Sequence, residues 1–451
     1  MKFTDTLKAI APCAWLLLCT SAALANDASP CSKHAQAILK SMDDGDFEGA
    51  RANFDANMKA HLSADQLSAV WASLPAQAGA RLAVAPGRVA PNGDSEIAII
   101  PIHHEKAWLE LQVSCSSADE VTGLFVRPGK DPAVAVLGAP APAYADPSRF
   151  EEREHTFTSD GLQFSGTLSL PRVGHPVPAV VLVHGSGPHD RDETVGGNKP
   201  FRDLAQGLAS RGIAVLRFDK RTQAYPQSFS GKVYSVREEV IADALAAIAS
   251  LSEQKEVDRK RVYLVGHSLG AMLAPRIARE APDLAGIVLL AAPARGLLDV
   301  IPFQLEYLAR LDGKIDTAER AQMAQLQAVV AKTRSFSDKD RADPTPVLGA
   351  PAAYWMDLAN YDPIAQTRAL KRPTLLLQGE GDFQVTIKQD YAPWVKALGK
   401  EPWFASQSFP GIGHLYTPAG NKPGPADYDQ PANVDVVVID AIAHWIDAPA
   451  L

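Results

Sequence analysis

The sequence predicts an α/β fold in which a mostly parallel sheet with helices on both faces follows a smaller α+β domain. The first observation is a series of short apolar runs that alternate with amphipathic helical stretches in the C-terminal part of the chain. Strands that are apolar on both faces and separated by helices are typical of a covered parallel sheet. The second observation is that an earlier part of the chain shows a strict alternation of apolar and polar residues. Such alternation is typical of antiparallel strands with one buried face. The apolar runs are 179–183, 213–218, 262–265, 287–290 and 374–377.

Length and composition indicate a globular protein with two folded units. The chain has 451 residues, more than one typical core accommodates. Hydrophobic residues make up 46% and charged residues 21%, which disfavours disorder. The net charge is −8, and no basic cluster interrupts that acidity. Because a nucleic-acid groove needs cations to offset phosphates, we expect no nucleic-acid partner.

Residues 1–25 are predicted to be a signal peptide. Lys2 and Lys8 form a basic start, an apolar run surrounds residues 15–18, and Ala23-Leu24-Ala25 is a small-residue cleavage site. The apolar run is shorter than the roughly 20 residues that a membrane span needs. We therefore expect cleavage after Ala25, no stable membrane span afterwards, and a periplasmic or secreted mature protein.

Residues 26–127 are predicted to form the smaller domain. Helix-like spacing over 32–74 is followed by strand patterns over 81–127, of which 108–113 alternates with a period of two. In length and element order this part resembles the cone-shaped α+β domain of the nuclear transport factor 2 and ketosteroid-isomerase group, which is cystatin-like in outline. Two cysteines remain after signal cleavage, Cys31 and Cys115, and the sequence leaves open whether they pair.

The rest of the chain is divided by composition. Residues 128–149 are rich in Pro, Ala and Gly and are expected to be a linker. Residues 150–451 are expected to form the larger domain, with a helical cap inserted over about 294–370. Aromatic and aliphatic residues of this insertion are candidates for a substrate pocket, with simple core packing as the alternative. They are Phe303, Leu305, Tyr307, Leu308, Tyr354 and Trp355.

A candidate nucleophile lies in Gly266-His267-Ser268-Leu269-Gly270, which matches the pattern G-x-S-x-G. The pattern follows the run 262–265 and precedes a helix-like stretch over 271–280, the strand–turn–helix context that the motif requires. Glycines are needed there because a side chain would collide with the backbone of so tight a turn. Ser268 then projects at the helix start, where backbone N–H groups stabilise an anion.

A second motif is expected to supply an oxyanion hole. The run 179–183 leads directly into His184-Gly185-Ser186-Gly187-Pro188. Small residues allow such a loop to approach a substrate oxygen closely. We expect the backbone N–H groups of Ser186 and Leu269 to be the two donors, with Gly187 as the alternative to Ser186.

The acid and the base are expected after later strands. Asp382 follows the run 374–377 through a glycine-rich turn, with Glu380 as the near competitor. His414 follows in another glycine-containing loop, which completes the chain order Ser, Asp, His. The remaining candidates are expected to be structural: Asp357 and Asp362 before the acid strand, and His444 against a packed surface of the last helix.

With these motifs in place, the chain from about residue 151 resembles bacterial α/β-hydrolase esterases that carry HGSGPxDRDE and GHSLG. Here the first motif spans residues 184–193. Phe218-Asp219-Lys220-Arg221 also fits the pattern, whereas Thr222 stands where relatives usually have glycine. The charged residues 190–192 are expected to hold the oxyanion loop through ion pairs rather than to contact substrate.

The resemblance implies a carboxylic-ester hydrolase that forms an acyl-enzyme on Ser268 and needs no metal or cofactor. A small-molecule ester is the expected substrate. A thioesterase or lactone hydrolase, or an acylaminopeptidase, would use the same three residues. A catalytically silent binding module is the alternative outside enzymes, and loss of one of the three would mark it.

Overall fold

The computed structural model describes residues 29–92, 95–129, 132 and 139–448. By their contacts, the residues divide into two compact units, Met1–Gly129 and Lys130–Leu451. The predicted signal peptide, residues 1–25, lies outside the described residues, as do residues 130–131 and 133–138 of the predicted linker. Within the described ranges, no helix is long and apolar enough to cross a membrane.

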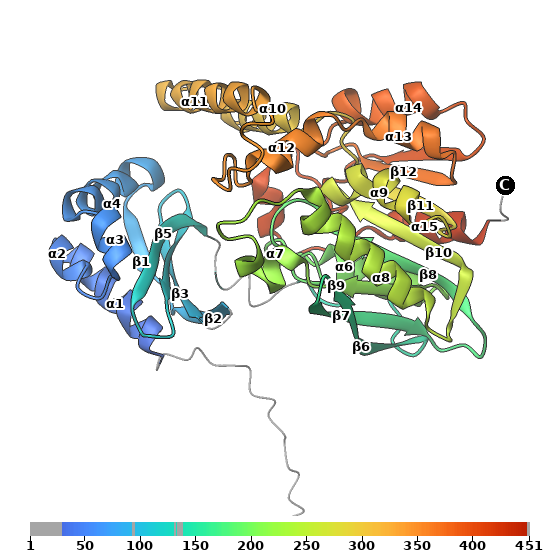
Figure 1. Cartoon of the computed structure of the whole chain (residues 1–451), viewed down its shortest axis with the longest axis horizontal. Coiled ribbons are helices and arrows are strands. Elements are labelled where there is room, and N and C mark those ends of the chain that lie inside the picture. Colours follow the sequence, from blue (N-terminus) through green and yellow to red (C-terminus); the bar gives the residue numbers. More distant parts are fainter. Residues whose placement is uncertain (1–28, 93–94, 130–131, 133–138, 449–451) are drawn as a thin grey trace, which may run out of the picture. The chain divides into compact units, whose positions relative to one another are not determined.

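The larger unit is built on an eight-stranded sheet of order β13-β12-β11-β10-β8-β9-β7-β6 (Figure 1). All neighbours from β9 to β13 pair in parallel, which confirms the predicted mostly parallel sheet. Among the described strands of this sheet, only β7 runs in the opposite direction, and it pairs antiparallel with both β6 and β9. The bounds are β6 Phe150–Ser159, β7 Leu162–Pro171, β8 Val177–Val183, β9 Ala214–Phe218, β10 Val257–His267, β11 Gly286–Leu290, β12 Thr374–Gly379 and β13 Phe404–Phe409.

Helices cover both faces of this sheet because successive strand residues point to opposite sides. In β8, Val180 and Leu182 pack with α6 and α15, whereas Val181 and Val183 pack with α8, α9 and α14. The two resulting cores bury the runs that the sequence shows as apolar throughout. The helices are α6 Pro200–Ala209, α7 Arg221–Ala224, α8 Ala242–Ser252, α9 Leu269–Glu280, α14 Ala392–Leu398 and α15 Val436–Asp447, with shorter turns over 226–228, 237–241, 387–391 and 425–429.

The predicted helical insertion follows β11 and precedes β12. It contains α10 (Leu297–Ala309), α11 (Thr317–Arg334), α12 (Ala352–Ala359) and α13 (Pro363–Leu370). α13 packs against α9 and so extends the helical layer on that face of the sheet, while α11 packs against α10 and α12. The cap is therefore formed by α10 to α12.

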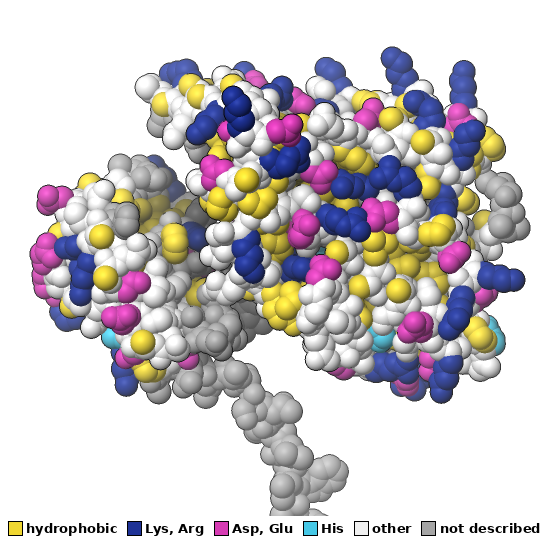
Figure 2. All heavy atoms as spheres, in the orientation of Figure 1, with side chains coloured by type: hydrophobic (Ala, Val, Ile, Leu, Met, Phe, Trp, Pro, Cys, Tyr) yellow, Lys and Arg dark blue, Asp and Glu magenta, His cyan; other side chains and the backbone are white. Residues whose placement is uncertain are grey.

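The surface of the larger unit mixes charges of both signs. Figure 2 shows Lys and Arg side chains interspersed with Asp and Glu on the visible face. Among the charged side chains of the larger unit, Arg276 pairs with Asp357 and Arg237 with Glu280. This face therefore presents no continuous basic track of the kind that follows a phosphate backbone.

In the described part of the smaller unit, helices α1 to α4 pack against an antiparallel sheet. The sheet order is β1-β3-β4-β5, with β2 paired to β3. The predicted alternation in β4 places Leu111, Val113 and Cys115 in the core. The bounds are α1 Pro30–Asp43, α2 Phe47–Ala50, α3 Ala56–His61, α4 Ala64–Ala78, β1 Arg81–Val84, β2 Arg88–Asn92, β3 Ser95–His104, β4 Trp108–Cys115 and β5 Val121–Gly129.

Cys31 and Cys115, whose pairing the sequence leaves open, form a disulfide between α1 and β4. Both residues lie in the core of the smaller unit. The link joins positions 84 residues apart, so it removes much of the freedom of the unfolded segment between them.

Replacing both cysteines by alanine should destabilise the smaller unit by roughly 2–4 kcal/mol, because the unfolded chain regains that freedom. Calorimetry of the full chain should show one transition move to lower temperature. Adding reductant to the double variant should cause no further shift, which controls for effects of the reductant itself. Unchanged transitions in the variant would contradict a stabilising role for this link.

Candidate active site

Ser268 lies in a strained turn between β10 and α9. Its backbone has φ 51° and ψ −113°, a region that non-glycine residues rarely adopt. The turn admits no side chain at either flanking glycine: a Cβ at Gly266 would lie 2.4 Å from the Gly270 carbonyl oxygen, and one at Gly270 would lie 2.2 Å from that of Val183. This is the geometry of a nucleophile elbow, in which the serine is held out at the start of a helix.

His414 and Asp382 meet in the loops that follow β13 and β12. His414 Nδ1 lies 2.7 Å from Asp382 Oδ2, and both side chains are buried. With Nδ1–H donated to the carboxylate, the other ring nitrogen, Nε2, is left to accept a proton. Ser268 and His414 line the same hollow, so the structure brings all three sequence-predicted residues to one edge of the sheet.

Asp382 is fixed by further donors that the sequence analysis missed. Gln378 Nε2 donates to Oδ2 at 3.1 Å, and the backbone N–H groups of Gln384 and Val385 donate to Oδ1 at 2.8 and 2.9 Å. Gln378 is fully buried at the end of β12. A polar residue in an otherwise apolar run, as here in Leu-Leu-Leu-Gln, is the signal that could have revealed it.

The other candidates lie elsewhere. Glu380 is exposed and accepts a hydrogen bond from Ser408 rather than from His414. Asp357 pairs with Arg276, and Asp362 caps the start of α13, both as expected of structural residues. The expectation that His444 faces a packed surface is wrong: it is exposed and binds the Asp440 carbonyl one turn earlier in α15.

The loop after β8 is fixed by side chains that bind its carbonyl oxygens. The Gly185 oxygen accepts from Lys220 Nζ at 2.8 Å, the Ser186 oxygen lies 2.8 Å from His189 Nε2, and the Gly187 oxygen accepts from Lys220 Nζ at 2.9 Å. Among the described residues, the N–H groups of Ser186 and Leu269, the two predicted donors, have no acceptor. Thr222, the departure from the family pattern, adds a bond of 3.2 Å to the Gly187 oxygen.

Glu193 and His267 form a buried ion pair beneath this loop. His267 Nδ1 lies 2.9 Å from Glu193 Oε2, and the two side chains are 6% and 1% exposed. Glu193 Oε1 accepts the Gly185 N–H at 2.7 Å, while His267 Nε2 lies 3.0 Å from the His414 carbonyl oxygen. The pair therefore connects the loop after β8, the turn at Ser268 and the loop of His414.

The charges of this pair stabilise each other. Burial by itself would raise the pKa of Glu193, but the positive charge of His267 outweighs it and lowers that pKa to about 2. Burial likewise would lower the pKa of His267, but the charge of Glu193 outweighs it and raises that pKa above its ordinary value. His184 differs: burial lowers its pKa to about 3, so it is neutral.

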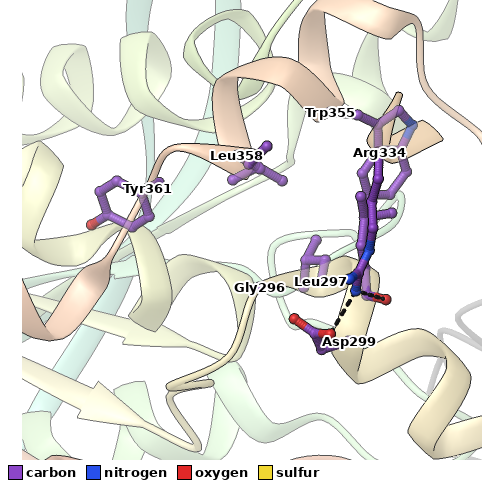
Figure 3. A pocket seen from close by; sticks show the side chains of 9 residues that line it. Gly296, Leu297, Asp299, Arg334, Trp355, Leu358 and Tyr361 are labelled. Atoms are coloured by element: carbon purple, nitrogen blue, oxygen red, sulfur yellow. Dashed lines mark hydrogen bonds and ion pairs between the residues drawn. The ribbon is translucent and has the colours of Figure 1, made fainter. Parts of the chain in front are cut away.

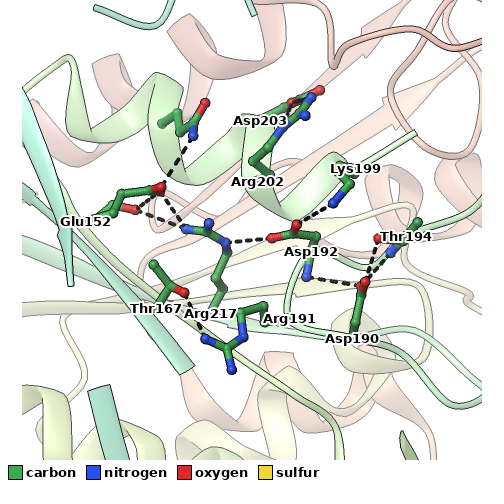
Figure 4. A network of polar contacts seen from close by, with 12 residues as sticks. Glu152, Thr167, Asp190, Arg191, Asp192, Thr194, Lys199, Arg202, Asp203 and Arg217 are labelled. Carbon is green, nitrogen blue, oxygen red and sulfur yellow. Dashed lines mark hydrogen bonds and ion pairs between the residues drawn. The ribbon is translucent and has the colours of Figure 1, made fainter. Parts of the chain in front are cut away.

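The remaining charged residues of the HGSGPxDRDE segment hold the loop, as expected. Figure 4 shows Arg217 between Glu152 and Asp192, and Lys199 on the far oxygen of Asp192. Asp190 accepts bonds from Asp192 and Thr194 within its own turn. Arg191 makes a two-pronged contact with Asp219 and also binds Glu154. None of these side chains lines the hollows at Ser268.

Two hollows meet at Ser268. The larger has a volume of about 380 Å³ and is lined mostly by apolar residues of the cap and of the loops beside it. The smaller, of about 170 Å³, is lined mostly by polar residues, His414 among them, together with Val195 and Leu415. Ser186, Ser268 and Gln384 line both. The apolar and aromatic residues of the larger hollow are Pro188, Tyr234, Pro293, Leu297, Val300, Ile301, Leu348, Ala350, Tyr354, Trp355 and Val385.

Only part of the predicted pocket lining is found there. Tyr354 and Trp355 line the larger hollow, whereas Tyr307 stacks on Phe383 and Phe303 lies under Arg295. A further hollow of about 260 Å³ lies on the other side of Leu297 and Trp355, which line both spaces. Figure 3 shows Arg334 passing Trp355 to form an ion pair with Asp299 at this outer hollow.

The Glu193–His267 pair predicts a pH-dependent stability. Glu193 has a depressed pKa, so its contribution is present above its unfolded value and lost as pH falls toward about 2. His267 has a raised pKa, so its contribution is present below its unfolded value of about 6.5 and lost as pH rises through the folded pKa. Glu193→Gln should therefore cost most between about pH 4.5 and 6.5, on the order of 3 kcal/mol.

Thermal unfolding of Glu193→Gln and wild type across pH 3 to 9 measures this directly. The exposed Glu380→Gln variant is the matched control and should follow the wild-type curve. If Glu193→Gln loses the same amount of stability at every pH, the charges of the pair contribute nothing to stability and only its packing does.

Comparison with known proteins identifies the family of the chain. A model of the alpha/beta hydrolase family matches residues 180–422. Esterase EstD of Thermotoga maritima is 37% identical over 404 residues, which cover 89% of this chain and 91% of the relative. Cutinase 2 of Thermobifida cellulosilytica is 29% identical over 157 residues, 35% of this chain and 53% of the cutinase. The crystal structure of the esterase domain from a Rhodothermus marinus protein, 20% identical, covers 65% of this chain and 97% of that domain with a TM-score of 0.39. The chain belongs to the α/β-hydrolase family and is a homologue of an esterase.

Proposed function

We propose that this chain is a serine esterase that cleaves carboxylic esters through an acyl-enzyme on Ser268. The observation that carries the proposal is the short contact between His414 Nδ1 and Asp382 Oδ2, with Ser268 lining the same hollow as His414. The likeness to Esterase EstD supports an ester as the substrate.

In this proposal the three residues divide the proton transfers. His414 Nε2 takes the proton of the Ser268 hydroxyl as its oxygen bonds to the ester carbonyl carbon. The N–H groups of Ser186 and Leu269 stabilise the resulting oxyanion, each donor being worth roughly 10²- to 10³-fold in rate. His414 then gives the proton to the departing alcohol. A water molecule repeats the sequence to release the acid, while Asp382 remains ionised and orients the imidazole.

The position of His414 also assigns the two hollows. The departing alcohol needs a proton from His414, so it leaves on the side of the smaller hollow, which His414 lines. The acyl group then occupies the larger hollow under the cap, where His414 is not among the lining residues. Its apolar walls fit an alkyl or aryl acyl group, and the smaller polar hollow fits a small alcohol.

Thioester or lactone hydrolysis is the second candidate, and one observation bears on it. The smaller hollow, of about 170 Å³, leaves little room for a bulky leaving group. A small thiol fits such a space, as does the hydroxyl that a lactone releases on ring opening and that stays tethered to the acyl group, whereas a large carrier thiol does not. Comparing an oxygen ester with its thioester of the same acyl group measures this preference.

Ser268→Ala should lose nearly all turnover, because the three residues act as a unit and losses on the order of 10⁶-fold accompany removal of such a nucleophile. Asp382→Asn should lose roughly 10⁴-fold in kcat through the wrong histidine tautomer. Steady-state hydrolysis of p-nitrophenyl esters measures both. Glu380→Gln is the matched carboxylate control and should stay near wild type; a larger loss there than in Asp382→Asn would contradict the assignment of the acid.

Ile301→Trp should shift the preferred acyl chain to shorter lengths, because the larger side chain fills part of the 380 Å³ hollow. Leu297→Ala should shift it to longer ones by opening the wall toward the outer hollow. A p-nitrophenyl series of increasing acyl length measures both. In a second series, with a fixed short acyl group and alcohols of increasing size, both variants should match wild type. If they change the alcohol series instead, the two hollows are assigned in reverse.

A further inference from the structure

We propose that Lys220 is a positioning residue for the oxyanion hole: its ammonium fixes the peptide whose N–H, that of Ser186, binds the substrate oxygen. The proposal rests on the proposed function. It gives a role to the Phe218-Asp219-Lys220-Arg221 motif, which catalysis as described leaves unused.

Lys220 reaches the loop because of the sheet order. β8 and β9 are parallel neighbours, so the segments that follow them leave the sheet at the same edge. Lys220 stands two residues after β9, is 3% exposed, and donates to the carbonyl oxygens of Gly185 and Gly187 at 2.8 and 2.9 Å. Its third donor is used by Glu239 Oε1 at 2.6 Å. An ammonium has three hydrogens, and all three are engaged.

The bond to Gly185 sets the direction of the Ser186 N–H. No described peptide bond is cis, and in a planar trans peptide the C=O of one residue and the N–H of the next point in opposite directions. When Lys220 holds the Gly185 carbonyl, the Ser186 N–H is therefore turned away from Lys220. Ser186 lines both hollows that meet at Ser268, which gives this N–H an open space where a substrate oxygen would lie.

The same bond strengthens the donor. A cation bound to the carbonyl polarises the peptide, and hydrogen bonds in such a chain reinforce one another. The neighbouring groups keep the peptide from turning over: Glu193 holds the Gly185 N–H, and His189 Nε2 lies 2.8 Å from the Ser186 oxygen. The loop is thus fixed in a form that favours charge development in the transition state over binding of the neutral ester.

Glu239 is the counter-ion that allows an ammonium to be buried here. An unpaired buried charge is strongly destabilising, so removal of Lys220 alone leaves Glu239 without its partner. The informative variant is the neutral pair Lys220→Met/Glu239→Gln. A second pair, Lys220→Gln/Glu239→Gln, retains an amide donor for the loop in an equally neutral interior. Arg261→Met is the control, because Arg261 also forms an ion pair, with Asp447, but is not bonded to the loop after β8 and lines neither hollow at Ser268.

Each variant is tested for kcat and KM on a p-nitrophenyl ester, per active site counted by burst titration, and for inhibition by an alkyl boronic acid. Boronates form a tetrahedral adduct on the serine oxygen and so report on the oxyanion hole. The neutral Met pair should lose roughly 10- to 100-fold in kcat with KM within about threefold, and boronate affinity should fall by a similar factor. The Gln pair should lie between the Met pair and wild type, and Arg261→Met should match wild type.

A purely structural role for Lys220 predicts fewer active sites and a lower Tm, with unchanged kcat per site. That result, or folded neutral pairs with wild-type kcat, would overturn the proposal. Failure of this proposal is distinguishable from failure of the proposed function. In the latter case the wild-type protein itself shows no burst and Ser268→Ala retains its activity.

Discussion

The close approach of α9 to the end of β8 is the constraint on which the site depends. Gly270 lies so near the Val183 carbonyl that any side chain would overlap it, and this contact seats the start of α9 directly on the sheet. It brings the Leu269 N–H beside the loop of Ser186 and holds Ser268 in a backbone conformation that it would not adopt alone. The buried cores on the two faces of the sheet offset the cost of this strained conformation.

Different interactions form the two sides of the site around Ser268: buried ion pairs on one side and apolar packing on the other. On the side of the loop after β8, buried charges in matched pairs fix the backbone: Glu193 with His267, and Lys220 with Glu239. Such pairs tolerate little displacement, because each partner left alone in the interior is costly. On the cap side, apolar side chains define a space without directional bonds, a surface that can change its shape by substitution. The part of the site that is fixed by ion pairs is thus separate from the apolar part, whose shape can change by substitution.

The sequence predicted the parallel sheet because its strands are short runs apolar on both faces. It predicted the positions of Ser268 and Asp382 because each follows such a run in a glycine-rich turn, and that of His414 because it comes after them in another glycine-containing loop. The antiparallel β6–β7 hairpin was missed, although Asp160-Gly161, both with positive φ, is the usual signal for a tight hairpin turn. The pairing of Glu193 with His267 joins residues that are far apart in the chain. Neither spacing nor propensity encodes such a contact, which follows from the strand order of the sheet.

The hairpin has a consequence for how this protein behaves in a crowded solution. β6 is the last strand of the sheet, and an uncovered last strand can recruit a strand from another molecule. Here its chain runs Phe-Glu-Glu-Arg-Glu, and Glu151, Arg153 and Glu154 are engaged in ion pairs with neighbouring segments. Those fixed charges oppose the docking of a foreign strand along this border. These charges on β6 thereby disfavour aggregation through this edge of the sheet.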